Sequence, residues 1–135
     1  MTYKITFTQK PAYLHAVVIG SNTKKNVVCY LADIHRECIE RACMHVLIEE
    51  RLEGPRLGTM DVFEIASKGR DRVTGPLPNI AFVDVNAVDS MMAFAEDVAI
   101  NRGTYVRVFK TVADAERWLL ELNTASVKPQ LDVAD

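Results

Sequence analysis

The sequence predicts one α/β domain: a five-stranded mixed sheet with the element order ββαβαβαβα, made of an N-terminal hairpin and four helices. Residues 3–19 alternate apolar and polar side chains with the period of two that is typical of strands. Short apolar segments and segments of helical periodicity then follow one another along the chain. A length of 135 residues allows one hydrophobic core and is too short for two substantial domains.

The chain begins with an expected antiparallel hairpin. In residues 3–8, the apolar side chains alternate with Lys4, Thr6 and Thr8, which predicts a strand with one face in water. Pro11 belongs to a short turn, because its ring fixes φ and it has no amide hydrogen. Residues 12–19 are the second strand, and so short a turn favours antiparallel pairing.

The first helix is expected over about residues 23–41, where apolar residues from Val27 to Cys38 recur at helical spacing. Residues 21–23 are all suitable N-cap types, so the start of this helix stays open by a turn. The apolar run at residues 44–48 predicts a strand buried on both faces, which ends at the charged residues that follow it.

The second half of the chain continues the alternation of helices and strands. The segment 51–58 is rich in glycine and proline and is expected to be a loop. The ordered domain is expected to span residues 1–123, with a flexible tail at 124–135 because these residues show no period. The remaining elements are a helix with Thr59 as its N-cap that ends near Gly69, a strand at 80–83, a helix from 89 or 90 to about 101 that Gly103 caps, a strand at 105–109 and a helix from about 111 to 122.

Composition excludes several classes of function. The chain has 16 basic and 18 acidic side chains, so it lacks the basic excess that nucleic-acid binding requires. No apolar run approaches the ~20 residues of a membrane span, and we expect no membrane insertion. The N-terminus has the pattern of strands rather than that of a signal peptide, which favours a cytoplasmic location.

Motifs for common cofactors and metals are missing from the sequence. It contains no nucleophile elbow, no phosphate-binding loop of the Walker type and no dinucleotide-binding glycine pattern, and we predict no cofactor. Cys29, Cys38 and Cys43 lie near His35 and His45, but they lack the closely spaced pairs that structural zinc prefers. Buried, reduced thiols are the favoured interpretation of the three cysteines.

Charged and polar residues at the ends of the expected strands form the best candidate site. Side chains just beyond the carboxyl ends of parallel strands make the natural binding crevice of an open α/β sheet. Glu50 and Asp84 would approach one another there, and they could serve as a general acid and base. The alternative that we favour is an ionic network that holds the loop 51–58. The candidate binding or regulatory residues are Glu49, Glu50 and Arg51 after the third strand, Asp84 and Asn86 after the fourth, and Arg56 and Thr59 beside them.

The last third of the chain carries a resemblance to a known family. The segment FAEDVAINRG at 94–103 is followed by VRVF at 106–109 and by ADAERWL at 113–119. Together with the order of elements, these segments resemble the STAS fold of bacterial anti-sigma factor antagonists and of the cytoplasmic tails of sulfate transporters. They are most similar to the STAS-like proteins grouped with Sec14-like domains. The resemblance covers about residues 3–122.

This resemblance implies a non-catalytic protein-interaction or regulatory module with a protein partner. In the antagonist branch, the switch is a serine that follows an acid at the start of the helix after the third strand. The chain has Leu57-Gly58-Thr59-Met60 there, so the acid and the serine are missing and Thr59 is the nearest phosphate acceptor. The alternative is a carrier or sensor of a small, lipid-like apolar ligand, which Met60, Met91 and Met92 would suit. An enzyme that uses the strand-end carboxylates is a third alternative.

One face of the sheet is also a candidate for homodimerisation. Crossovers that step in one direction along a sheet place their helices on one side of it, so the other side needs a different cover. A second copy of the chain would bury an uncovered apolar face. The alternation that suggests such a face involves Tyr13, His15 and Val17 in the second strand and Tyr3, Ile5 and Phe7 in the first.

Overall fold

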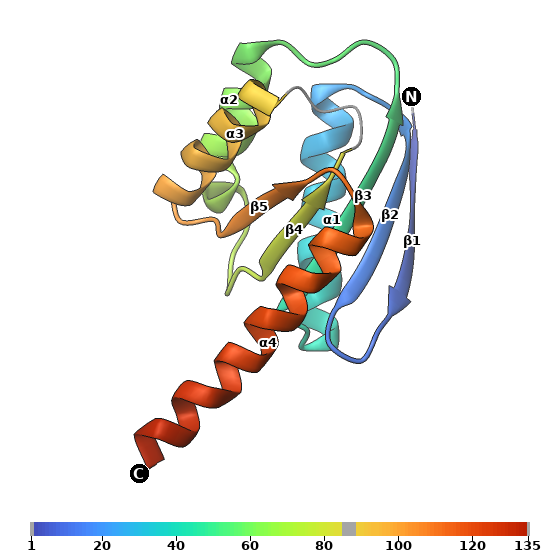
Figure 1. Cartoon of the computed structure of the whole chain (residues 1–135). Coiled ribbons are helices and arrows are strands. Elements are labelled where there is room, and N and C mark those ends of the chain that lie inside the picture. Colours follow the sequence, from blue (N-terminus) through green and yellow to red (C-terminus); the bar gives the residue numbers. More distant parts are fainter. Residues whose placement is uncertain (1, 85–88, 135) are drawn as a thin grey trace.

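The structure is a computed structural model that describes the backbone of residues 2–84 and 89–134, with side chains at 2–84 and 92–123. The predicted fold class and element order are confirmed: a single α/β domain with a five-stranded mixed sheet (Figure 1). In chain order, the elements are β1 (Tyr3–Gln9), β2 (Leu14–Ser21), α1 (Lys24–Arg41), β3 (His45–Glu53), α2 (Thr59–Lys68), a short 3₁₀ turn (Arg70–Arg72), β4 (Asn79–Val83), α3 (Asp89–Asn101), β5 (Val106–Phe109) and α4 (Val112–Ala134).

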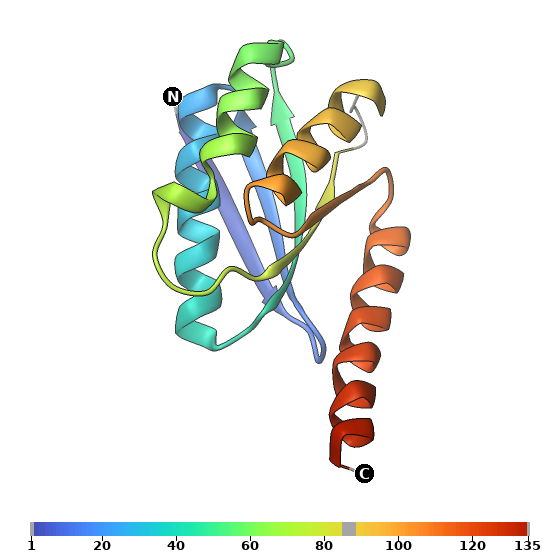
Figure 2. The same ribbon diagram turned by 90° about the vertical axis from the view of Figure 1, so that its left-hand side faces the viewer.

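The strands lie side by side in the order in which they occur in the chain, β1-β2-β3-β4-β5. The hairpin of β1 and β2 is antiparallel, and every later pairing is parallel. Because the parallel crossovers all step in one direction, α1, α2 and α3 cover the same face of the sheet. Figure 2 shows α4 on the opposite face.

The first hydrophobic core lies between α1 and the hairpin side of the sheet. Leu14, Ala16 and Val18 point to this face from β2 and pack against Tyr30 and Ile34 of α1. The helix begins after Thr23, whose side-chain oxygen accepts a hydrogen bond from the Asn26 amide at 3.1 Å. Thr23 is therefore the N-cap among the three residues that the sequence left open.

The second core lies under α4 on the other face. Trp118, Leu119 and Ala115 of α4 pack against Leu47 of β3 and Ala81 of β4, among others. The helical backbone of α4 continues to Ala134, through the segment expected to be a tail. Within the described residues, no helix is long and apolar enough to cross a membrane.

The third strand is longer than the apolar run predicts. Residues 44–48 were expected to form it, whereas β3 runs from His45 to Glu53. The reason is that β2 pairs with β3 over its whole length, from Leu14 opposite Val46 to Ser21 opposite Glu53. Glu49, Glu50 and Arg51 therefore lie within the strand and not beyond its end, so the expected position of these residues is wrong.

The apolar alternations of β1 and β2 do not share a face, so the expectation that they form one surface is wrong, whereas homodimerisation itself stays a prediction. Tyr3, Ile5 and Phe7 of β1 pack on the core beneath α1. In β2, His15 and Val17 alternate with buried Ala16 and Val18 and point to the opposite side. Part of that side is covered by α4 (Figure 2).

Candidate functional site

A cavity of about 290 Å³ lies between the sheet and the layer formed by α1, α2 and α3. It lies beneath α2, which packs mainly against α3 and α1 rather than against the sheet. The walls are mostly apolar. They are formed by Val27 and Leu31 of α1, Val62, Ile65 and Ala66 of α2, Ile80 and Phe82 of β4, Met92, Ala95 and Ala99 of α3, and Val106 of β5.

Glu50 and Asp84 form a polar end of this cavity. Glu49 is opposite Val83 in the register of β3 and β4, so Glu50, within β3, is the neighbour of Asp84, which directly follows β4. Both of them line the cavity. The Tyr30 hydroxyl donates a hydrogen bond to Glu50, and Nη2 of Arg56 donates one to Asp84 at 2.8 Å. Glu50, Arg56 and Asp84 are thus brought together on the helix-covered face.

The environment of Glu50 favours its neutral form. Burial raises the pKa of Glu50 to about 7; the hydrogen bond from Tyr30 opposes this rise, and the nearby Asp84 carboxylate adds to it. Tyr30 is fully buried, and burial together with the charge of Glu50 holds the pKa of its hydroxyl well above the ordinary value. Tyr30 therefore stays a hydrogen-bond donor over the whole physiological range of pH.

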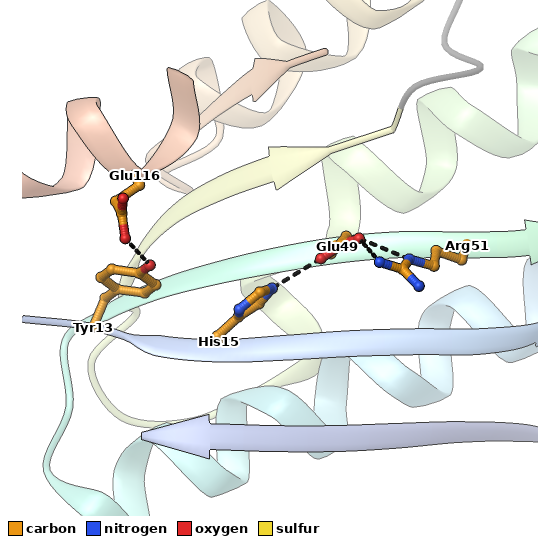
Figure 3. A network of polar contacts seen from close by, with 5 residues as sticks. All are labelled: Tyr13, His15, Glu49, Arg51 and Glu116. Atoms are coloured by element: carbon orange, nitrogen blue, oxygen red, sulfur yellow. Dashed lines mark hydrogen bonds and ion pairs between the residues drawn. The ribbon is translucent and has the colours of Figure 1, made fainter. Parts of the chain in front are cut away.

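Glu49 and Arg51 lie on the other face of the sheet and take no part in the cavity. Figure 3 shows Glu49 between His15 and Arg51. The His15 Nε2 atom lies 3.0 Å from Glu49, and Nε of Arg51 donates a hydrogen bond to Glu49 at 2.7 Å. Burial alone would raise the pKa of Glu49, but the hydrogen bonds from Arg51 and His15 outweigh it, and the pKa is lowered. Nearby, the Tyr13 hydroxyl donates to Glu116 of α4 at 2.6 Å.

Thr59 is not the N-cap of the second helix, so this expectation is wrong. Gly58 takes the cap position in an extended conformation, without a side-chain hydrogen bond, and Thr59 is the first residue of α2. Its side chain is exposed. The Val62 amide donates the first hydrogen bond of the helix to the Gly58 carbonyl, and this bond makes Gly58, rather than Thr59, the cap residue. Asn86, the last of the candidate residues, lies outside the described residues.

In the described part of the chain, no three histidine, cysteine or acidic side chains are grouped so that they could hold a metal ion. Cys29, Cys38 and Cys43 are free thiols. Burial raises the pKa of Cys38 to about 12, so this thiol is inert at neutral pH.

Two polar groups at the cavity were missed in the sequence. Tyr30 lies three residues after Val27 and four before Ile34, and this spacing could have placed its ring on the buried face of α1. Thr104, just before β5, also lines the cavity. Among the described side chains, its hydroxyl oxygen is buried without a hydrogen-bond partner. Nothing in the local sequence distinguishes this threonine from one in an ordinary turn.

Comparison with known proteins leaves the site to be interpreted from its geometry. No protein-family model matches the chain, and no curated protein matches it either. What the geometry offers is an apolar cavity, a pair of adjacent carboxyl groups at one end of it, and a surface arginine bound to one of them.

Proposed function

We propose that the chain binds a small, mainly apolar molecule in the cavity beneath α2 and acts as its carrier or sensor. The observation that carries this proposal is the cavity itself, whose volume of about 290 Å³ lies near the lower limit of ligand sites. Such sites combine apolar walls with a few polar groups that orient the ligand. Glu50, Asp84 and Arg56 are suitable for that role here.

Binding is favoured over catalysis by the side chains that line the cavity. The described lining residues include no serine, cysteine, histidine or lysine, so the commonest nucleophile–base pairs of covalent catalysis are not found among them. The His15–Glu49 pair is on the opposite face of the sheet. Glu50 and Asp84 are the remaining acid–base candidates, and each of them already accepts a hydrogen bond from a neighbouring side chain.

A STAS-like regulatory module is the second candidate function. The N-terminal hairpin, the βα units that follow it and the sheet order support this assignment. A partner would meet the segment before α2, where Arg56 is half exposed and Thr59 is exposed. Under this proposal, Arg56→Ala and Thr59→Glu weaken the binding of a protein partner without unfolding the chain. Retention of every interaction by both variants in affinity capture would contradict it.

Replacing either of two alanines of α3 by leucine tests the proposed ligand binding. Ala95 lines the cavity, whereas Ala93 is exposed on the same helix. Ala95→Leu fills part of the cavity, and Ala93→Leu adds the same atoms to the surface. Titration of n-octanol, a neutral apolar probe, is followed by heteronuclear NMR with each variant.

We expect n-octanol to shift the signals of residues that line the cavity in the wild-type chain and in Ala93→Leu. The same shifts should be lost or strongly reduced in Ala95→Leu. Equal shifts in both variants would mean that the probe binds elsewhere. No binding to the wild-type chain by n-octanol or by a panel of apolar metabolites would overturn the proposed function.

A further inference from the structure

The charged groups around the cavity are mainly acidic. Its lining includes three carboxyl side chains, Glu50, Asp84 and Glu96, and one guanidinium, Arg56. Glu96 extends from α3, and its carboxylate accepts a hydrogen bond from the Val108 amide at 2.9 Å. An apolar molecule with an anionic group would meet net repulsion in such a cavity.

Arg56 balances the charge of Glu50 only in part: its nearby charge lowers the pKa of Glu50, but burial raises that pKa by more. Its guanidinium pairs with Asp84 from the solvent side, with 42% of the arginine side chain exposed against 4% for Asp84. Among the ion pairs of the described residues, none includes Glu50, whose hydrogen bond comes from the neutral Tyr30 hydroxyl. An ionised Glu50 would therefore be a partly buried carboxylate without a cation of its own, which is a costly state unless a ligand supplies the cation.

A second observation, independent of the acidic groups, also points to a ligand in the cavity. The Thr104 hydroxyl oxygen is buried and, among the described groups, has no hydrogen-bond partner. Val106 pairs with Ile80, so Thr104 lies near the start of β4, whereas Asp84 follows its end. Thr104 is level with Pro78, so Thr104 and Asp84 are roughly 20 Å apart along the strand, from about 3.3 Å per residue. A buried polar atom of this kind usually has a partner, which a second polar group of an elongated ligand, beyond its hydrocarbon part, would provide.

We propose that the ligand is an elongated apolar molecule with a protonated amine, which binds between Glu50 and Asp84 while its hydrocarbon part lies along the walls from Phe82 to Ile80. This inference rests on the proposed function and specifies the chemical class of the ligand. The ammonium group donates hydrogen bonds to the two carboxylates, and Tyr30 and Arg56 keep those carboxylates in position. A carboxylic acid of the same length is rejected by the same groups.

The amine binds the ionised form of Glu50, so its affinity depends on pH. The groups that face Glu50 are Tyr30 from α1, Asp84 after β4, and Arg56 before α2, with Glu96 of α3 also on the cavity wall. In the free chain the pKa of Glu50 is about 7, so at lower pH most of the Glu50 carboxyl groups carry a proton that must be released before the amine binds. This proton release weakens the binding of the amine at low pH. We expect n-octylamine to bind about tenfold more tightly at about pH 8 than at about pH 6.

The experiment compares n-octylamine, n-octanol and octanoate, which share one hydrocarbon chain, by isothermal titration calorimetry. The chains compared are the wild type, Glu50→Gln and Glu49→Gln, where the last makes the same change of charge on the opposite face of the sheet. We expect n-octylamine to bind at least about tenfold more tightly than n-octanol, and octanoate most weakly. Glu50→Gln should remove the advantage of the amine, and Glu49→Gln should keep it.

Tighter binding of octanoate than of n-octylamine, or an amine advantage that survives in Glu50→Gln, would overturn the inference. The pH dependence is measured on the wild-type chain, so a poorly folded variant cannot obscure the result; affinity that falls between about pH 6 and about pH 8 also contradicts the inference. If n-octanol binds in the cavity and the amine has no advantage, this inference fails while the proposed function stands. If no probe binds, both fail.

Discussion

Glu49 and Glu50 are adjacent in the chain but lie on opposite faces of the sheet, where they meet opposite environments. Glu49 is held by Arg51 and His15, and its pKa is lowered. Glu50 accepts a hydrogen bond from Tyr30 beside the cavity, and burial raises its pKa to about 7. The alternation of β3 is the cause, because successive side chains of a strand point to opposite faces. Substitutions at these two positions therefore report on two separate sites.

The first prediction concerns the pH dependence of stability that Glu50 causes. Its pKa is higher in the folded chain than the ordinary value of 4.5, so the folded state binds more protons between the two values. This contribution to stability is present below the unfolded pKa and is lost as the pH rises through about 7. The loss is on the order of 3–4 kcal/mol, at about 1.4 kcal/mol for each pKa unit between 4.5 and about 7.

Glu50→Gln should remove this loss, so the variant gains stability relative to the wild-type chain between about pH 5 and about pH 8. Urea unfolding at both values measures the difference. Glu49→Gln is the control, because the contribution of Glu49 to stability depends on pH in the opposite direction. Because the pKa of Glu49 is lowered on folding, its contribution is present above the unfolded pKa and disappears in acid. Parallel pH profiles for the two variants would contradict the assignment.

The second prediction compares two arginines. Arg56→Ala removes a donor from Asp84, a carboxylate whose residue is only 3% exposed, and should cost on the order of 1–3 kcal/mol of unfolding free energy. Arg51→Ala removes an exposed arginine from Glu49, which keeps His15 as a partner, and should cost less than about 1 kcal/mol. Chemical denaturation at neutral pH gives both values, and equal costs would contradict the difference in burial.

The third prediction tests the two threonines at helix starts. Thr23→Ala removes the side-chain cap of α1 and should lower the unfolding free energy by about 1 kcal/mol. Thr59→Ala should leave it within about 0.5 kcal/mol, because Thr59 is exposed and Gly58 holds the cap position. If Thr59→Ala were as damaging as Thr23→Ala in thermal unfolding, the observed start of α2 would have to be revised.

The fourth prediction concerns how α4 packs on the sheet. Leu119 is fully buried in the second core, whereas 46% of its neighbour Leu120 is exposed. Leu119→Ala should cost about 2–5 kcal/mol, and Leu120→Ala should cost less than about 1 kcal/mol. Trp118 lies in the same core and is the only tryptophan, so its fluorescence follows the unfolding of this region directly. If Leu120→Ala instead lowered the unfolding free energy more than Leu119→Ala, the observed orientation of α4 on the sheet would be contradicted.

Most of the fold could be predicted from the sequence, because hydrophobic periodicity changes wherever the element type changes. The predicted end of the third helix illustrates this: α3 ends at Asn101, and Gly103 has the expected positive φ, at 94°. The end of β3 could not be predicted. Glu49, Glu50 and Arg51 interrupt the apolar run, and the partners that make them acceptable inside a strand, Tyr30 and His15, come from other elements.

The approach of Glu50 to Asp84 could be predicted from strand order, but the cavity beside them could not. A cavity depends on how far α2 stands from the sheet, and this distance follows from the packing of α2 on α1 and α3. Small residues such as Ala66 and Ala95 occur in many helices with filled cores, so their presence alone predicts no cavity.

The agreement between strand order and chain order has a consequence for biosynthesis. Every strand pairs with the strand that comes immediately before or after it in the sequence, from β1 to β5. A chain that leaves the ribosome from its N-terminus can therefore extend the sheet at one edge only, and no late strand has to be inserted between two that are already paired. We expect the nascent chain to gain the sheet stepwise, with α4 closing the second core last.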